Sequence, residues 1–379
     1  MNRFGDAEAV SNRTDETVNT AVFQVKPTYM PSGKWMFQMK LMSILDWYST
    51  RYSGSTETLQ RQSRQEISLS GYVGWNPSGD FSVSLTPRIV ANLWRIGDIK
   101  GHTVSPICTA YARWAMSRKA SVSLSVNVYM KAPGAAESNP VLVRNTDLLW
   151  VMGNPYLKTL KSWDFYIYSN FLINDWLSMS PVAGLTKTYD GVVATYEAAS
   201  QEMGGLIRRN VNAGTEDWIR TGCTFTGAFF NRSLSVRLSP SWEYTHTRDP
   251  YRMYLNRFSF SGSVDYTVGD FMVGVEYKGP NKYVSDRGMS RKWRQSYLDF
   301  SATYGTGDIF VRFKVENLFN NKRKEWIKMV TPCYERSYNN FETGRAFVLS
   351  VSYTFGYGKK VDRSIDVQGP ESVKTSVIN

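Results

Sequence analysis

The stretch Ile309–Val315, which reads Ile-Phe-Val-Arg-Phe-Lys-Val, decides the fold class. In it Val311 and Phe313 alternate with Arg312 and Lys314. Successive side chains of an extended chain point to opposite faces, so this segment would carry one apolar face and one polar face. The stretch therefore predicts a β-strand that separates an apolar environment from a polar one.

The same period-2 alternation returns in windows along most of the chain: 81–89, 122–130, 234–244 and 347–355. A soluble β-sandwich also alternates, with apolar residues facing an inner core and polar residues facing water. Length separates the two folds, because sandwich strands usually run for about 5 or 6 residues, whereas about 10 cross a bilayer at a tilt. Several windows here sustain alternation for that longer span. We predict an all-β fold, a transmembrane antiparallel β-barrel.

Composition excludes several other classes. Mean hydropathy is −0.36, and the best apolar runs, such as Leu148–Met152, fall far short of the about 20 residues that a helical span needs. Transmembrane helices are therefore excluded. The net charge of +12 could suit a nucleic-acid binder, but Lys and Arg are scattered singly and the dense run 322–328 is short. No nucleic-acid partner is expected.

Few residues suggest catalysis or metal binding. Cys108, Cys223 and Cys333 are widely spaced and odd in number, so neither a disulfide framework nor a zinc motif is visible. His102 and His246 are far apart, and His246 has carboxylates nearby but no identifiable nucleophile. We predict no catalytic, cofactor-binding or metal-binding residues, and we do not expect an enzyme.

Aromatic residues and turn signals fit a barrel that crosses a membrane. Six tryptophans near strand ends are predicted to form girdles at the two interfaces: Trp35, Trp47, Trp94, Trp163, Trp176 and Trp242. Short polar turns are predicted at 31–34, 76–80, 116–119, 174–175, 231–232, 268–270 and 305–308. Long outer loops are predicted near 50–60, 96–102, 133–161, 190–213, 284–292 and 319–343.

This rhythm gives about 15 strands, from near Val18 to Phe355. Bacterial single-chain barrels normally have an even number of strands, so we expect the chain to be the C-terminal part of a larger barrel, without the signal peptide. The expected organisation is a loop or N-terminal extension over 1–16, a barrel portion over 17–356 and a periplasmic C-terminal tail over 357–379.

Three segments resemble a known family. They are Gly153-Asn-Pro-Tyr-Leu157, Asn317-Leu-Phe-Asn-Asn-Lys-Arg323 and Ser352-Tyr-Thr-Phe-Gly-Tyr-Gly-Lys-Lys360. Together they resemble the closing strands of TonB-dependent outer-membrane receptors, and the last resembles the Bacteroidetes branch in particular. In that family the complete barrel has roughly 22 strands and a folded plug in its lumen. This chain would correspond to about the last two-thirds of such a barrel.

The resemblance implies a receptor and transporter barrel for TonB-dependent nutrient uptake, located in the bacterial outer membrane. The implied partners are outer-membrane lipid, the TonB system acting through a plug domain that this chain lacks, and a surface lipoprotein that binds substrate. No cofactor is implied. Two alternatives stay open: a plugless barrel of structural or adhesive role, and a membrane-embedded hydrolase.

Candidate site residues fall into three groups. Arg237, Arg312 and Lys314 would face the lumen, where they either attract an anionic ligand or pair with nearby carboxylates. Trp326, Tyr334 and Tyr338 would lie in an outer loop, where they either stack on a ligand or pack the loop against the rim. Tyr353 and Phe355 are predicted to serve as the assembly signal of the terminal strand.

Overall fold

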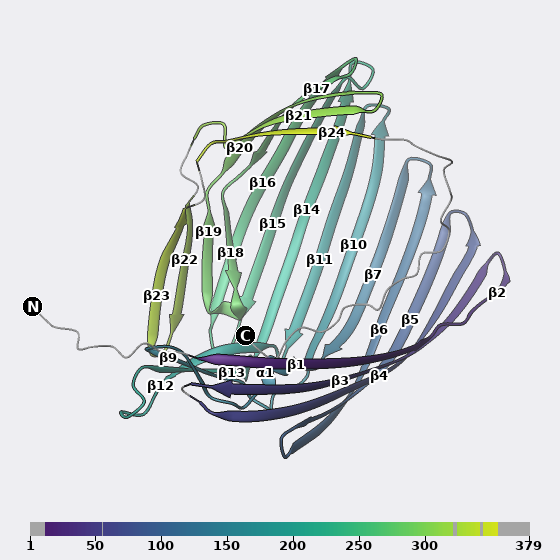
Figure 1. The fold of residues 1–379 in the computed structure, drawn as a ribbon. Coiled ribbons are helices and arrows are strands. Elements are labelled where there is room, and N and C mark those ends of the chain that lie inside the picture. Colours follow the sequence, from purple (N-terminus) through teal and green to yellow (C-terminus); the bar gives the residue numbers. More distant parts are fainter. Residues whose placement is uncertain (1–11, 55, 321–323, 342–343, 355–379) are drawn as a thin grey trace, which may run out of the picture.

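The computed structural model describes residues 12–54, 56–320, 324–341 and 344–354, and their core is one large curved antiparallel sheet (Figure 1). Fifteen of its strands follow one another by pairing, and β2 pairs only with β3. The strands are β1 (Arg13–Val25), β2 (Thr28–Ser32), β3 (Trp35–Ser53), β4 (Thr58–Ser78), β5 (Phe81–Ile96), β6 (Ile99–Ser117), β7 (Ala120–Lys131), β10 (Leu160–Asn174), β11 (Leu177–Tyr189), β14 (Thr215–Phe229), β15 (Leu234–Thr247), β16 (Met253–Val268), β17 (Phe271–Lys278), β20 (Tyr297–Thr306), β21 (Ile309–Glu316) and β24 (Ala346–Tyr353).

The strand count confirms the predicted number of crossings. β1 and β2 pair with the same strand, and Pro27 lies between them. Proline has no N–H to donate, so it interrupts the ladder while the chain continues in the same direction. The first strand begins at Arg13, ahead of the predicted boundary at 17. Phe355 and the predicted tail lie outside the described residues.

Within the described chain, β1 pairs only with β3 and β24 pairs only with β21, so the sheet has two free edges. All neighbouring strands along the path are antiparallel. With an odd number of them, the two edge strands run in the same direction. The edges therefore could not join each other as an antiparallel pair.

All seven predicted short turns connect neighbouring strands, for example at Gly79-Asp80 and Gly307-Asp308. The predicted long loop at 96–102 is wrong, because Gly97-Asp98 closes a two-residue turn between β5 and β6. Gly97 has φ of 58°, a value that favours glycine. At the same end, residues 248–252 form a connection that the turn signals did not reveal.

The longer connections fold into two small sheets at the end opposite the short turns (Figure 1). One has the order β12-β13-β9-β8 and the other β18-β19-β22-β23. The elements are α1 (Ala135–Ser138), β8 (Val143–Thr146), β9 (Leu149–Met152), β12 (Val192–Ala198), β13 (Leu206–Asn212), β18 (Asn281–Ser285), η1 (Asp286–Gly288), β19 (Ser290–Arg294), β22 (Lys324–Thr331) and β23 (Tyr334–Phe341). No helix of the described chain is long and apolar enough to span a membrane.

A small core joins these connections. Val193, Ala213, Tyr251 and Met289 pack together, although they come from three different connections of the wall. Burial raises the pKa of Tyr251 to about 12. The phenol therefore stays protonated near neutral pH and donates to the carbonyl of Ala194 at 2.9 Å. The outer connections thus form a packed cap.

The two faces of the wall differ as predicted. One carries large exposed apolar side chains, such as Leu69, Ile89 and Phe258. Register places Arg64 and Arg88 on the opposite face. The prediction of a membrane girdle is wrong for Trp94, one of the six tryptophans. Trp94 lies directly opposite Arg64 and therefore on the polar face, where its ring covers Gly101.

Candidate functional site

A polar cavity of about 440 Å³ lies on the inner face of β15, β16, β17, β20 and β21. The three predicted lumen cations, Arg237, Arg312 and Lys314, all line it. Strand periodicity places each on the inner face, and antiparallel register brings Arg312 and Lys314 opposite Thr303 and Ser301. The cavity therefore gathers residues that lie almost 80 positions apart in the sequence.

The cations of the cavity are unequally neutralised. The Lys314 ammonium lies 3.2 Å from Asp299 and 2.8 Å from Glu316. In the described part of the chain, no ion pair joins Arg237 or Arg312 to a carboxylate. Asp265, Glu276 and Asp299 also line the cavity, so an anion would bind at the two guanidinium groups that no carboxylate neutralises.

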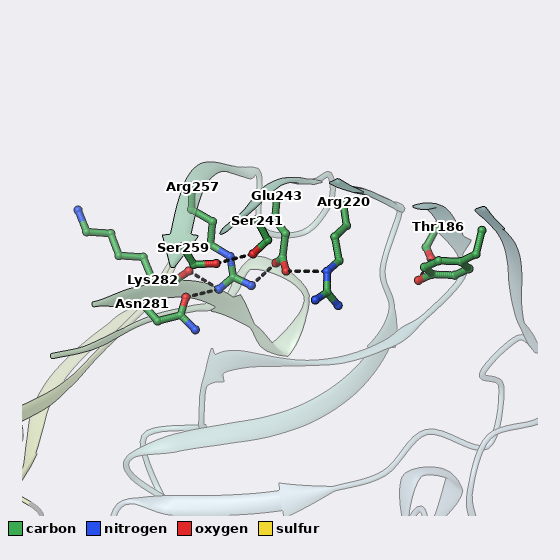
Figure 2. Close-up of polar contacts among 9 residues, drawn as sticks. Thr186, Arg220, Ser241, Glu243, Arg257, Ser259, Asn281 and Lys282 are labelled. Atoms are coloured by element: carbon green, nitrogen blue, oxygen red, sulfur yellow. Dashed lines mark hydrogen bonds and ion pairs between the residues drawn. The ribbon is translucent and has the colours of Figure 1, made fainter. Parts of the chain in front are cut away.

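A second polar group crosses the inner face toward the cap (Figure 2). Glu243 is 8% exposed and lies between Arg220, at 3.6 Å, and Arg257, with which it forms a short ion pair and hydrogen bond. Register explains the arrangement, because Glu243 lies directly opposite both arginines on β14 and β16. Arg257 also donates to Asn281 Oδ1 and to the Lys282 carbonyl, both at 2.6 Å. Arg257 thus ties the wall to β18, and Glu243 supplies its counter-charge.

Replacing Glu243 by glutamine should destabilise this part of the wall by about 2 kcal/mol, because Arg257, whose side chain is 17% exposed, would lose its counter-charge. Glu276→Gln is the matched control. Glu276 is 45% exposed and pairs with Lys278, an exposed kind of ion pair that contributes about 0 to 1 kcal/mol. Thermal unfolding in detergent measures both, and equal midpoints for the two variants would contradict the bridging role of Glu243.

The motif Gly153–Leu157 anchors the long connection between β7 and β10 to the inner wall. Asn154 N–H donates to the Glu137 carbonyl at 2.8 Å, and Leu157 is buried. Arg64 donates to the Pro133 carbonyl at 2.7 Å and to Ser138 Oγ at 3.3 Å. Sequence reasoning missed this role of Arg64, since its partners lie about 70 residues away.

The motif beginning at Asn317 ends β21. Asn317 is 1% exposed and has φ of 54°, a conformation that asparagine tolerates better than most residues. Its N–H donates to Asp299 Oδ1 at 2.9 Å. Because Asp299 also contacts Lys314, this turn and the polar cavity share one carboxylate.

The three predicted outer-loop aromatics lie on the hairpin of β22 and β23, and they do not line the polar cavity. Tyr334 packs 5.4 Å from the Tyr196 ring, and the Arg336 guanidinium lies 4.8 Å from the Tyr338 ring. Trp326 is 51% exposed and lines a different cavity. On the last strand, Tyr353 is 53% exposed and lies opposite Ile309.

His246 lies on the apolar side of the alternation, away from Glu243. Its Nδ1 is 4.0 Å from Asp217 Oδ2, and its nearest ring neighbour is Tyr244. Across the described ranges there is no group of three or more His, Cys, Asp or Glu side chains arranged to hold a metal ion.

Comparison with known proteins gives the context for this wall. No family model matches the chain, and no curated protein matches it. Solved structures do. The copper transporter OprC matches with a TM-score of 0.71 at 10% identity, over 90% of this chain and 57% of its own. The FrpB iron transporter from Neisseria meningitidis matches with a TM-score of 0.61 at 12% identity, over 91% of this chain and 56% of its own. The pyoverdine outer membrane receptor FpvA from Pseudomonas aeruginosa PAO1 matches with a TM-score of 0.60 at 10% identity, over 91% of this chain and 54% of its own.

The chain therefore spans just over half of the length of these solved proteins. They are transporters and receptors, and none is named as an enzyme. The narrower resemblance to the Bacteroidetes branch stays a prediction. At this level of identity the likeness concerns the fold, and the chain has the barrel fold of TonB-dependent outer-membrane receptors.

Proposed function

We propose that this chain forms the wall of an outer-membrane receptor that takes up a hydrophilic nutrient with the help of the TonB system. The observation that carries the proposal is the division of one continuous fifteen-strand sheet into an apolar outer face and a charged inner face. Such a wall suits a lipid bilayer on one side and a watery passage on the other.

The inner face supports an anionic cargo. Arg237 and Arg312 have no carboxylate partner among the described side chains, so a negatively charged solute would gain ion pairs there that it lacks in water. The proteins with this fold include transporters named for copper and iron and a receptor named for pyoverdine. We propose a negatively charged metal chelate as cargo, captured near the cap and passed along the inner wall.

The proposed route needs partners outside the described chain. Energy would reach the barrel from the TonB system through a plug domain, and a surface lipoprotein that binds substrate would deliver the cargo. Both partners follow from the resemblance of the closing strands, and the fold supports them only in general terms.

Uptake in cells tests the proposal. A strain lacking the gene should accumulate a radiolabelled, negatively charged iron or copper chelate more slowly than the parent, and the restored full gene product should recover the rate. A protonophore should abolish the difference, because TonB-dependent uptake is energised from the inner membrane. Equal uptake with and without the gene for every metal source would favour the structural or adhesive barrel.

The hydrolase alternative has less support. His246 shares its face with the apolar band, and Asp217 beside it is also 3.5 Å from Lys187. An esterase assay on the His246→Ala variant tests this alternative. Activity that the parent shows and the variant loses would favour it over transport.

Cysteine labelling should reveal the orientation of the wall. Cys333 is exposed at the tip of the β22–β23 hairpin, whereas Cys108 and Cys223 lie within strands, opposite Pro87 and Pro181 on the apolar face. A membrane-impermeant maleimide added to intact cells should label Cys333 in the parent, and the Cys333→Ser variant should lose the labelled peptide. Labelling of Cys333 only after permeabilisation would reverse the proposed topology.

A further inference from the structure

A second cavity, of about 390 Å³, lies between the loop end of β16 and the small sheet of β18, β19 and β22. It differs in character from the polar cavity, because its walls include Phe258, Trp293 and Trp326 together with Lys282 and Arg294. No Asp or Glu is among the described residues that line it. The cavity is therefore both aromatic and cationic.

Pairing in the small sheet arranges three of these residues in a row. Lys282 on β18 lies directly opposite Trp293 on β19, and Trp293 lies directly opposite Trp326 on β22. Directly opposite residues of antiparallel strands share a face. One amino group and two indole rings thus lie side by side on one surface of this sheet.

The cavity lies at the loop end of the apolar outer face. Phe258 is 67% exposed and is opposite Trp242, one of the predicted girdle tryptophans. Between Met253 and Phe260, at the loop end of β16, the described wall strand that pairs with it is β15. The pairing of β16 with β17 covers only Ser261–Val268. The lining of the cavity therefore continues the apolar band where the band ends.

Arg257 and Lys282, two cations at this cavity, make different contacts. Arg257 is held by Glu243 and Asn281, as Figure 2 shows. In the same view the Lys282 side chain extends away from that pair, while its backbone carbonyl accepts from Arg257. The network on the inner face thus fixes the backbone of Lys282 and leaves its ammonium to the cavity.

We propose that this cavity binds a phosphorylated membrane lipid, with its phosphate at Lys282 and the start of its acyl chains against Phe258 and Trp326. This inference rests on the membrane location in the proposed function, although not on transport. Aromatic rings and basic side chains at the level of the headgroups are what such an amphiphile meets favourably. A free phosphate would use only the cations and would leave the aromatic surface in water.

Lipid retention tests the proposal on the full gene product, purified in detergent and stripped of native lipid. Native mass spectrometry should show retained phosphatidylglycerol, but not diacylglycerol, which lacks the phosphate. Lys282→Glu should reduce retention by about tenfold, because it replaces an attraction by a repulsion. Lys119→Glu, in an exposed short turn at the opposite end, is the matched charge control and should retain lipid like the parent.

Two further measurements keep the proposal open to failure. Trp326→Ala should reduce retention severalfold, whereas Trp163→Ala, at another exposed aromatic of the same end, should not. Glycerol phosphate at millimolar concentration should fail to displace the lipid, and displacement by it would show a site for a soluble anion instead. Equal retention by the parent and Lys282→Glu would overturn the proposal. Loss of nutrient uptake with lipid retention intact would leave it standing and defeat only the transport function.

Discussion

Replacing Ile89 by arginine is expected to cost about 2 to 4 kcal/mol of stability in the membrane. Ile89 lies near the middle of β5, is 55% exposed and has Leu69, itself 49% exposed, directly opposite on β4. The guanidinium would enter the middle of the apolar band, where hydrocarbon cannot solvate it. In the outer membrane of cells, the amount of heat-resistant full gene product should fall severalfold or more.

Ser84→Arg provides the control on the same strand. Ser84 lies on the polar face, which also carries Arg88 in an ion pair with Glu66 at 3.1 Å. A charge added there should change the amount of protein little, since inner positions are in contact with water. If Ile89→Arg accumulates like Ser84→Arg, the assignment of the two faces is wrong.

A polypeptide of these 379 residues is expected not to close into a barrel by itself. Among the residues that the structure describes, β1 and β24 leave a row of backbone N–H and C=O groups unpaired on each free edge. Each such group costs several kcal/mol in hydrocarbon, so a complete edge is prohibitive. The parallel directions of the two strands prevent the antiparallel closure that bacterial barrels use.

Refolding in detergent followed by electrophoresis without heating measures this effect. A closed eight-stranded outer-membrane barrel, treated in the same way, should run as a compact heat-modifiable band. The 379-residue polypeptide should aggregate or associate through its edges, and it should give no stable single-channel conductance. A compact monomer that conducts would show that the edges find a way to pair.

The wall could be predicted from the sequence because its signals are local. The alternation in Ile309–Val315 and the turn residues at 79–80 or 307–308 lie within a few positions of one another. They determine strand, face and reversal without any knowledge of distant segments. The face of Arg312 and Lys314 follows from the same rule.

The cap could not be predicted in this way. β13 pairs with β9 in parallel, with Leu206 beside Leu149, and no local period indicates a partner so far away. Trp94 shows a related limit, because an aromatic near a strand end fits a girdle whichever face it occupies. The polar cavity could be predicted only in part. Periodicity predicts the face of the wall on which Arg237 lies, but the strand register determines its position along the wall relative to Arg312.

The strands of the wall differ greatly in length, so its two sides are built differently at the loop end. β4 has 21 residues and β21 has 8, which correspond to about 70 Å and about 26 Å of extended chain. The short strands barely cross a bilayer, whereas the long ones project well beyond it at the loop end. On the side of the short strands, the small sheet of β18, β19, β22 and β23 continues at the loop end (Figure 1). The part of the receptor outside the membrane would therefore consist of wall strands on the side of β3 to β6 and of connections on the other side.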